Sequence, residues 1–248
     1  MQEFSIIVPT YNEERYIDKC LTSITSQEYD RSKFEIIVAD SSSTDKTADV
    51  AHARADQFVT SDKRGIAHGR NLGAQHASGT ILVFVDADVS LEKGFLNEIQ
   101  RSFANEQVVA VTGVPSPMDG KLLQRWTYHG TYMIVRAFNA AKLPFYPGIC
   151  VAYRRDVFQK CGGFREDFGI VEDLDLTKRV SRHGKCVVNT KAKALVSTRR
   201  LDRFAFSTVM FHIYSDLRYL LTGTASKFYP KEEEIHSPLD LWRQWRQE

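Results

Sequence analysis

Two aspartates, Asp86 and Asp88, directly follow the apolar segment from Ile81 to Val85. A short apolar run between turn residues is typical of a strand that is buried on both faces. Carboxylates at the end of such a strand are costly unless a cation or a hydrogen-bond donor meets them. Oxygen ligands at this spacing suit Mg²⁺ or Mn²⁺, which are usually shared with substrate phosphates. The pair therefore predicts a divalent-metal site, while a solvated turn at the strand end is the structural alternative.

Other common ligand motifs are absent from the sequence. Counted from Asp86, Leu91 and Asn97 occupy the positions at which an EF-hand requires Gly and Glu. Neither G-x-G-x-x-G after a strand nor G-x-x-x-x-G-K-[ST] occurs, which disfavours a dinucleotide dehydrogenase and a P-loop nucleoside triphosphatase. Any phosphate bound here must therefore be neutralised by a metal ion and basic side chains.

The elements that must position these aspartates alternate between two periodicities. Strands are predicted at 4–8, 34–39, 57–60, 81–85 and 108–112, and helices at 13–25, 45–53, with Thr44 as N-cap, 65–77 and 91–103. Gly69 and Gly73 weaken the third helix. This alternation predicts an α/β fold, a Rossmann-like and mostly parallel sheet flanked by helices.

Polar side chains follow each of the first four predicted strands. They are Thr10, Tyr11 and Asn12, then Asp40, then Lys63 and Arg64, then Asp86 and Asp88. Since the carboxyl ends of parallel strands share one edge, where open α/β sheets bind ligands, we expect these residues to lie close together. Lys63, Arg64 and Arg70 suit phosphate, Asp40 can accept from a base, and Asp86 can accept from ribose hydroxyls. Together they predict a site for a nucleoside diphosphate with its metal.

Four segments, in this order and spacing, resemble family 2 glycosyltransferases, which have a GT-A fold. They are Ile7–Glu13 (IVPTYNE), Ile37–Thr47 (IVADSSSTDKT), Gly65–Gly73 with Arg70-Asn-Leu-Gly, and Phe84–Asp88 (FVDAD). The resemblance covers roughly residues 4 to 200. One departure is Ser41-Ser42, where the family commonly has Asp-Gly; the carboxylate at Asp40 is kept.

The resemblance implies transfer of a sugar from a nucleotide-diphosphate donor with inversion at the anomeric carbon. The residues that it assigns to the nucleotide sugar are Pro9, Thr10, Tyr11, Glu13, Asp40, Lys63, Arg70, Asp86 and Ala87. Asp40 would face the base and Arg70 the diphosphate. Asp88, with Asp86, would hold Mn²⁺ or Mg²⁺. A UDP-sugar is favoured over a guanine nucleotide on the weight of the family alone, and the sugar is not specified.

The second half of the chain is expected to supply the acceptor side. A loop is predicted at 113–121, a helix at 126–141 broken by 144–148, a strand at 149–153, a short helix at 157–161, and two strands at 185–189 and 194–197. Glu172, Asp173 and Asp175 begin a helix that runs to Arg182, where acids favour the helix dipole. The resemblance instead makes Asp173 the general base, with Glu172 holding the acceptor or orienting the loop. Gly163 and Phe164 would border the sugar and the acceptor.

The C-terminal part contains an amphipathic helix at 204–221 and a tail. Arg199, Arg200, Arg203 and Arg218 surround this helix. It is expected to pack on its own domain, to form a homodimer, or to lie on a membrane through 203–222. We therefore divide the chain into a catalytic domain, 1–200, with a nucleotide-sugar half, 1–112, and an acceptor half, 113–200, followed by 201–248.

Bulk properties narrow the setting. The chain has 248 residues, 43% of them apolar, and a net charge of +2, which gives no reason to expect nucleic acid as a partner. Four scattered cysteines, with neither a signal-peptide pattern nor an apolar stretch of about 18 residues, favour a cytoplasmic protein, with peripheral contact at the inner face of a membrane left open. The expected acceptor is a glycan or a lipid-linked molecule. A sugar nucleotidyltransferase and a catalytically inactive nucleotide-sugar-binding relative are the alternatives.

Overall fold

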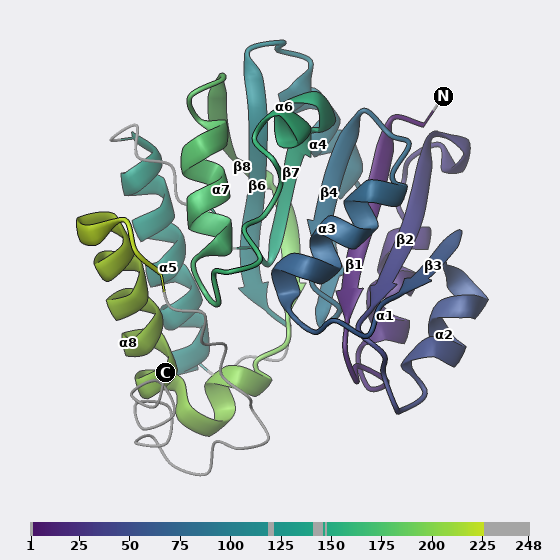
Figure 1. The fold of residues 1–248 in the computed structure, drawn as a ribbon, viewed down its shortest axis with the longest axis horizontal. Coiled ribbons are helices and arrows are strands. Elements are labelled where there is room, and N and C mark those ends of the chain that lie inside the picture. Colours follow the sequence, from purple (N-terminus) through teal and green to yellow (C-terminus); the bar gives the residue numbers. More distant parts are fainter. Residues whose placement is uncertain (1, 119–121, 141–145, 147, 226–248) are drawn as a thin grey trace.

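The computed structural model describes residues 2–118, 122–140, 146 and 148–225, and within them all side chains except those of 122–125, 127, 128, 131 and 200–210. In this part of the chain eight strands form one mixed sheet with helices on both faces (Figure 1). The strands are β1 (Phe4–Thr10), β2 (Phe34–Asp40), β3 (Gln57–Thr60), β4 (Ile81–Val85), β5 (Val89–Leu91), β6 (Val108–Pro117), β7 (Cys150–Arg154) and β8 (Lys185–Val196). Their order is β3-β2-β1-β4-β7-β6-β8-β5. The predicted α/β class is confirmed.

The first four strands of this order are parallel. Thr10 is in register with Asp40, and Asp40 with Thr60, so the three strands end at one level. β4 joins β1 on the other side, and its last residue, Val85, directly precedes Asp86. The structure therefore confirms that the polar residues after β1, β2, β3 and β4 share one edge of the sheet.

The other half of the sheet is mixed. β7 lies antiparallel between β4 and β6, so β4 and β6 are not neighbours. β6 is parallel to β8 and continues to Pro117, which corrects the loop predicted from Gly113. Pairing with β8 explains the longer strand, because Val114 to Pro117 are in register with Lys193 to Val196. The two strands predicted at 185–189 and 194–197 are one strand, and the short β5 was not predicted.

The helices are α1 (Ile17–Thr25), α2 (Thr47–Arg54), α3 (Ile66–His76), α4 (Phe95–Phe103), α5 (Leu122–Ala140), α6 (Arg155–Lys160), α7 (Glu172–Val180) and α8 (Arg199–Thr222), with a 3-10 turn at Arg31–Lys33. Side chains alternate across β1, so Phe4, Ile6 and Val8 pack with α1, α2 and α4, whereas Ile7 packs with α3, α6 and α7. Helices thus cover both faces and leave the carboxyl edge of β1 to β4 to the loops.

Three helices, α1, α2 and α4, begin later than predicted because the residues before them form loop or strand contacts. Glu13, the predicted start of α1, instead donates from its backbone nitrogen to Thr47 Oγ1 over 2.8 Å. The N-cap predicted at Thr44 is also wrong. Asp45 accepts from the Thr47 nitrogen over 2.9 Å and so precedes α2. α4 begins at Phe95 because residues 89–91 pair with β8.

The glycines of α3 allow that helix to lie very close to β1. A Cβ atom added to Gly73 would stand 2.4 Å from Ile7 Cγ2, and one added to Gly69 would stand 3.2 Å from Pro9 Cβ. The helix therefore forms despite its glycines, because packing outweighs their low helix propensity. This close packing holds Arg70, between the two glycines, at the edge of the sheet.

Within the described residues no helix is long and apolar enough to cross a membrane. All four cysteines are free thiols, and Cys20 and Cys150 are buried. The segment 144–148, predicted to end the preceding helix, and the tail predicted from about 223 lie mostly outside the described residues.

Candidate active site at the carboxyl edge of the sheet

The loops after β1 and β2 are held together by Asp40. Its Oδ1 accepts from Thr10 Oγ1 over 2.8 Å and from Ser43 Oγ over 2.6 Å, and its Oδ2 accepts from the Ser43 nitrogen over 2.8 Å. Asp40 is only 3% exposed. Its contacts therefore shape the pocket predicted for the nucleotide, and a direct contact to the base stays a prediction.

The residues after β3 contact the loop after β1 and Glu166. The Arg64 guanidinium lies 4.4 Å from the centroid of the Tyr11 ring, and both side chains are accessible. Lys63, expected at the diphosphate, forms an ion pair of 2.5 Å with Glu166. The Arg64 guanidinium thus lies over the Tyr11 ring, and the predicted roles of Tyr11 at the nucleotide and of Lys63 at the phosphate stay predictions.

Arg70 is a buried cation shared by two carboxylates. Its Nη2 donates to Asp86 Oδ1 and its Nη1 donates to Glu172 Oε1, both over 2.9 Å. The residue is 2% exposed, and the Phe164 ring lies 5.3 Å from its guanidinium carbon. Burial opposes this charge, yet Asp86 and Glu172 raise the pKa of Arg70 above its ordinary value. The structure therefore joins two regions that the sequence separates widely, the α3 motif and the acidic start of α7.

Gly148 connects Arg70 to Asp173. The Gly148 oxygen accepts from Arg70 Nη2 over 2.9 Å, while its nitrogen donates to Asp173 Oδ2 over 2.6 Å. A Cβ atom at this position would stand 2.4 Å from Arg70 Nη2, so the contact requires glycine. Asp173 Oδ1 accepts from the Leu174 nitrogen over 2.7 Å, and the side chain remains partly accessible. The carboxylate is thus fixed by backbone donors at the edge of the sheet.

The carboxyl groups of Glu172 and Asp173, at the start of α7, both have raised pKa values. Burial, followed by the charge of Asp173, raises the pKa of Glu172 to about 8 against the opposing effect of Arg70. Burial also raises the pKa of Asp173, while Arg70 and the N–H groups of Gly148 and Leu174 act in the opposite direction. A carboxylate with a raised pKa is a better proton acceptor than an ordinary aspartate.

Gly163 and Phe164 lie next to Arg70 and Asn71 of α3. Phe164 is 2% exposed and packs edge-on against Phe84 at 5.0 Å. Asn71 accepts from the Phe164 nitrogen and donates to the Phe164 oxygen, each over 2.9 Å. Gly163 has φ +68°, in the left-handed region that favours glycine. The described contacts are structural, and the predicted acceptor role of both residues stays a prediction.

The two aspartates after β4 face different cations. Asp86 pairs with Arg70, and Asp88 Oδ2 lies 3.3 Å from Nε of Arg199, the first residue of α8. Ala87 between them is 4% exposed. Within the part of the chain that the structure describes, no group of three or more His, Cys, Asp and Glu side chains could hold a metal ion by itself. The donor set nevertheless fits an ion such as Mg²⁺, which commonly uses one or two carboxylates together with substrate phosphates.

Comparison with known proteins identifies the family of this chain. Residues 5–162 match the sequence model of glycosyl transferase family 2. The chain belongs to this family. It is 28% identical to the glycosyltransferase AglE of Haloferax volcanii over 189 residues, which is 73% of this chain and 62% of that protein. It is 31% identical to a PGL/p-HBAD biosynthesis glycosyltransferase of Mycobacterium bovis over 188 residues, 71% of this chain and 68% of that protein. It matches 18% of the length of TarS of Staphylococcus aureus, at 33% identity over 104 residues, 40% of this chain. The chain thus spans less than two thirds of some curated relatives.

Solved structures show the same fold. A mannosyltransferase from Pyrobaculum calidifontis, in complex with GDP-Man and Mn²⁺, has a TM-score of 0.73 at 26% identity, covering 90% of this chain and 65% of that one. Residues 1–349 of TarS from Staphylococcus aureus, in complex with UDP-GlcNAc, have a TM-score of 0.65 at 21% identity, covering 88% and 67% of the two chains. Family 2 membership and the GT-A fold, both expected from the sequence, are confirmed.

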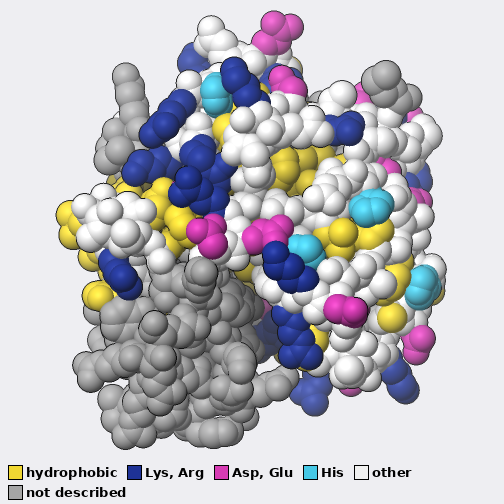
Figure 2. Space-filling view, viewed as in Figure 1, with side chains coloured by type: hydrophobic (Ala, Val, Ile, Leu, Met, Phe, Trp, Pro, Cys, Tyr) yellow, Lys and Arg dark blue, Asp and Glu magenta, His cyan; other side chains and the backbone are white. Residues whose placement is uncertain are grey.

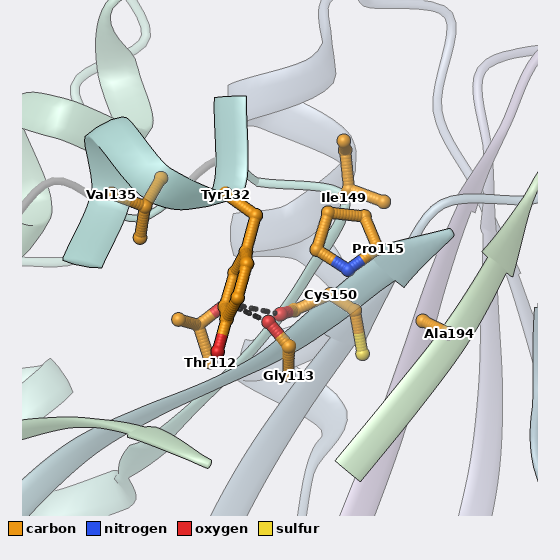
Figure 3. Close-up of a pocket in the computed structure, with 8 residues that line it drawn as sticks. All are labelled: Thr112, Gly113, Pro115, Tyr132, Val135, Ile149, Cys150 and Ala194. Carbon is orange, nitrogen blue, oxygen red and sulfur yellow. Dashed lines mark hydrogen bonds between the residues drawn. The ribbon is translucent and has the colours of Figure 1, made fainter. Parts of the chain in front are cut away.

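A small apolar pocket of this family 2 chain is lined by residues of β6, α5 and β8 and by the start of β7 (Figure 3). Ile149, one of its lining residues, follows Gly148, and its oxygen accepts from the Asp86 nitrogen over 3.2 Å. Tyr132 of α5 lies over the pocket, and the Thr112 hydroxyl below donates to the Cys150 oxygen over 3.0 Å. The remaining lining residues are Gly113, Pro115, Val135 and Ala194. The pocket thus begins one residue along the chain from Gly148, which contacts Arg70 and Asp173.

Helix α8 of this family 2 fold packs against α7 and the segment before it. The Tyr219 hydroxyl donates to Asp175 Oδ1 over 2.8 Å, and its ring packs on Phe168 at 5.8 Å. Burial and then the charge of Asp173 raise the pKa of Asp216, one turn before Tyr219, to about 8. The expectation that this helix packs on its own domain is thus met by one of its faces.

Sequence reasoning did not place Gly148, Arg199, Asp216 or Tyr219 at this site. Each acts through a partner that is far away along the chain, so no local pattern identifies it. Arg199 was the one residue with a sequence signal. It is the first of two arginines that follow a predicted strand, and the carboxylates of the motifs need positively charged partners.

Proposed function

We propose that this chain transfers a sugar from a nucleotide-diphosphate sugar, with a UDP-sugar favoured, to a hydroxyl group of an acceptor, with inversion at the anomeric carbon. The observation that carries the proposal is the Gly148 link between Arg70 and Asp173. It fixes a partly accessible carboxylate with a raised pKa beside the cation that binds Asp86. Family 2 membership and glycosyltransferase relatives support the same reaction class.

Asp173 is proposed as the general base. Each of its oxygens accepts one backbone N–H, and each retains a lone pair for an acceptor hydroxyl. As the hydroxyl oxygen bonds to the anomeric carbon, its proton passes to Asp173 and the bond from that carbon to the diphosphate oxygen breaks. The products are the glycoside and the nucleoside diphosphate, and the proton later leaves Asp173 for solvent.

The donor side must neutralise the leaving diphosphate. Asp88, with Asp86, would hold Mn²⁺ or Mg²⁺, and such an ion stabilises the negative charge that develops on the leaving group. Arg70 is already bound by Asp86, Glu172 and Gly148, so it orients Asp86 towards the donor. Tyr11 and the Asp40-supported loop would hold the base.

Replacing Asp173 with Asn tests this assignment. We expect turnover of a UDP-sugar to fall about 100-fold or more, because a general base contributes about 10²–10⁴, while UDP binding with Mn²⁺ changes little. Asp167→Asn, at an exposed carboxylate of the same segment, is the matched control and should keep activity. Full turnover by Asp173→Asn would contradict the assignment. Release of pyrophosphate from a nucleoside triphosphate would support a nucleotidyltransferase instead.

We further propose that the acceptor is lipid-linked and that the enzyme approaches it at a membrane surface. Among the described side chains, the large exposed apolar ones all lie on α5 and α8: Trp126, Met133, Ile134, Ile213, Tyr214, Leu217, Leu220 and Leu221. Lys and Arg side chains gather beside apolar surface on that side of the molecule (Figure 2). Exposed Lys178 and Arg182 follow Asp173 on and just beyond α7. An apolar face bordered by basic residues suits an anionic lipid surface.

Vesicle flotation tests the membrane proposal. We expect the protein to float with phosphatidylglycerol-containing vesicles and less with pure phosphatidylcholine vesicles, and Leu217→Glu with Leu221→Glu to abolish flotation. Ala53→Glu, at an exposed position of α2, adds a charge elsewhere and should not change it. Absence of flotation, together with a dimer that these leucine substitutions dissociate, would show instead that the face is a subunit contact.

A further inference from the structure

The Arg199 guanidinium lies between the carboxylates of two motifs. Its Nη1 donates to Glu13 Oε2 over 2.8 Å and its Nη2 donates to Glu13 Oε1 over 2.5 Å. On its other side, Nε lies 3.3 Å from Asp88 Oδ2. One arginine therefore joins the loop after β1, the loop after β4 and the start of α8.

These contacts are of the kind that a guanidinium makes best. Its planar fork matches the Glu13 carboxylate with two parallel hydrogen bonds, and the Tyr16 ring lies 4.9 Å from its central carbon. The Arg199 side chain is 23% exposed and that of Asp88 is 10% exposed, so solvent screens this charge pair only in part. The guanidinium thus provides Asp88 with a resident positive charge.

A divalent ion on Asp88 would have to share that carboxylate with Arg199. Metal–oxygen distances are about 2.0–2.2 Å, so a metal ion and a guanidinium on one carboxylate would stand a few ångströms apart and repel. The proposed function brings both a metal ion and a diphosphate, and the diphosphate offers new acceptors for a guanidinium. The same arginine can therefore neutralise Asp88 before the donor arrives and phosphate afterwards.

The backbone allows this exchange without moving the sheet. The backbone nitrogen of Ser197 donates to the backbone carbonyl oxygen of Asp88 over 3.1 Å, and Val89 is in register with Val196. The main chains that carry Asp88 and Arg199 are thus fixed to each other, so a change of partner by the arginine side chain leaves the sheet in place.

We propose that Arg199 is a displaceable counter-ion at Asp88, which excludes the metal ion until a nucleotide diphosphate arrives and then pairs with the diphosphate. This inference rests on the proposed function. In this role Arg199 contacts the diphosphate of the donor and does not act on the bond that breaks. The metal ion and the nucleotide should consequently bind cooperatively, each being weak without the other.

Electron paramagnetic resonance of free Mn²⁺ tests the proposal without any turnover. Mn²⁺ is titrated against the full chain with and without UDP, for the wild type, Arg199→Gln, Arg199→Lys and the control Lys193→Gln, which removes a positive charge from β8. Without UDP, we expect Arg199→Gln to bind Mn²⁺ about tenfold more tightly than the wild type, because removing a nearby like charge favours the ion. Arg199→Lys, which keeps the charge without the fork, should be intermediate, and Lys193→Gln should match the wild type.

The second measurement is UDP affinity by calorimetry in metal-free buffer. Here we expect Arg199→Gln to bind several-fold more weakly than the wild type, so the two ligands shift in opposite directions. Mn²⁺ affinity that is unchanged or weaker in both Arg199 variants overturns the counter-ion proposal, and wild-type turnover then shows that the proposed function survives. Failure of every variant to bind either UDP or Mn²⁺ overturns both.

Discussion

Nη1 of Arg70 donates a 2.9 Å hydrogen bond to Oε1 of Glu172, and neither residue is more than 5% exposed. Nη2 of the same guanidinium binds Asp86. One buried cation therefore serves carboxylates from α7 and from the loop after β4. Removing the cation would leave buried Glu172 and half-buried Asp86 without compensation, whereas neutralising Glu172 leaves Arg70 paired with Asp86.

The two substitutions should thus differ in cost. Arg70→Met should lower the free energy of unfolding by about 3–5 kcal/mol, the usual loss when one partner of a buried ion pair is removed. Glu172→Gln should cost about 1 kcal/mol, because the amide oxygen still accepts from Arg70. Urea denaturation measures both, with Arg101→Met, at a side chain 71% exposed, as a control expected to stay within about 0.5 kcal/mol. An Arg70→Met protein as stable as Glu172→Gln would show that the ion pair does not hold the edge together.

Asp216 should make stability depend on pH. Burial, and then the charge of Asp173, raise its pKa to about 8, whereas in the unfolded chain it ionises near its ordinary pKa of 3.8. Between these pH values the folded protein keeps a proton on Asp216 that the unfolded chain has lost. The contribution of Asp216 to the free energy of unfolding is therefore fully present at low pH and is lost as pH rises towards 8. Asp216→Asn removes the titration, and its melting temperature should exceed that of the wild type by an amount that grows from pH 5 to pH 8. We expect at least about 1 kcal/mol at pH 8, since one unit of pKa difference is worth about 1.4 kcal/mol.

Exposed Asp167 provides the control for this pH series. Asp167→Asn should follow the wild-type melting curve at every pH. A constant difference between Asp216→Asn and the wild type across the range would mean that the carboxyl of Asp216 ionises normally in the folded protein.

Local sequence patterns predicted the strands well, because apolar runs that end in turn residues report burial directly. Ile81–Val85 and Gln57–Thr60 have the bounds that the pattern indicated. The patterns did not predict pairing: β7 separates β4 from β6, and β6 continues past Gly113 because β8 supplies its hydrogen bonds. Local patterns also could not predict which side chains meet in the site, because these contacts join residues that are far apart in the sequence. A motif indicates that Asp40 and Asp88 are important, but not that Asp40 is occupied by Thr10 and Ser43 or that Asp88 pairs with Arg199.

Gly73 and Gly130 form a matched pair of helical glycines. A Cβ atom on Gly73 would stand 2.4 Å from Ile7 Cγ2, whereas one on Gly130 of α5 would meet nothing within 4 Å. Gly73→Ala should therefore destabilise the protein by about 1–3 kcal/mol through overpacking against β1. Gly130→Ala should stabilise it by about 0.5–1 kcal/mol, because alanine is the better helix former. Thermal unfolding distinguishes the two, and equal shifts would show that α3 does not pack closely on β1.

Ser42 stands where family 2 chains commonly have glycine, and its backbone explains that preference. Its φ is +56°, in the left-handed region that costs a non-glycine residue about 1–2 kcal/mol. The side chain offsets this cost, since Ser42 Oγ donates over 2.9 Å to Asp62 Oδ1 and lies 3.2 Å from the Ser61 oxygen. Ser42→Ala keeps the strain and loses the hydrogen bonds, so it should lower the free energy of unfolding by about 1 kcal/mol. Ser42→Gly loses the same bonds but also the strain, and its free energy of unfolding should remain near that of the wild type.

The difference between the free energies of unfolding of the two variants, measured by urea denaturation, gives the strain at position 42. At exposed Ser26, where φ is −90°, glycine should be no more stable than alanine, and a similar result at Ser42 would contradict the strained conformation.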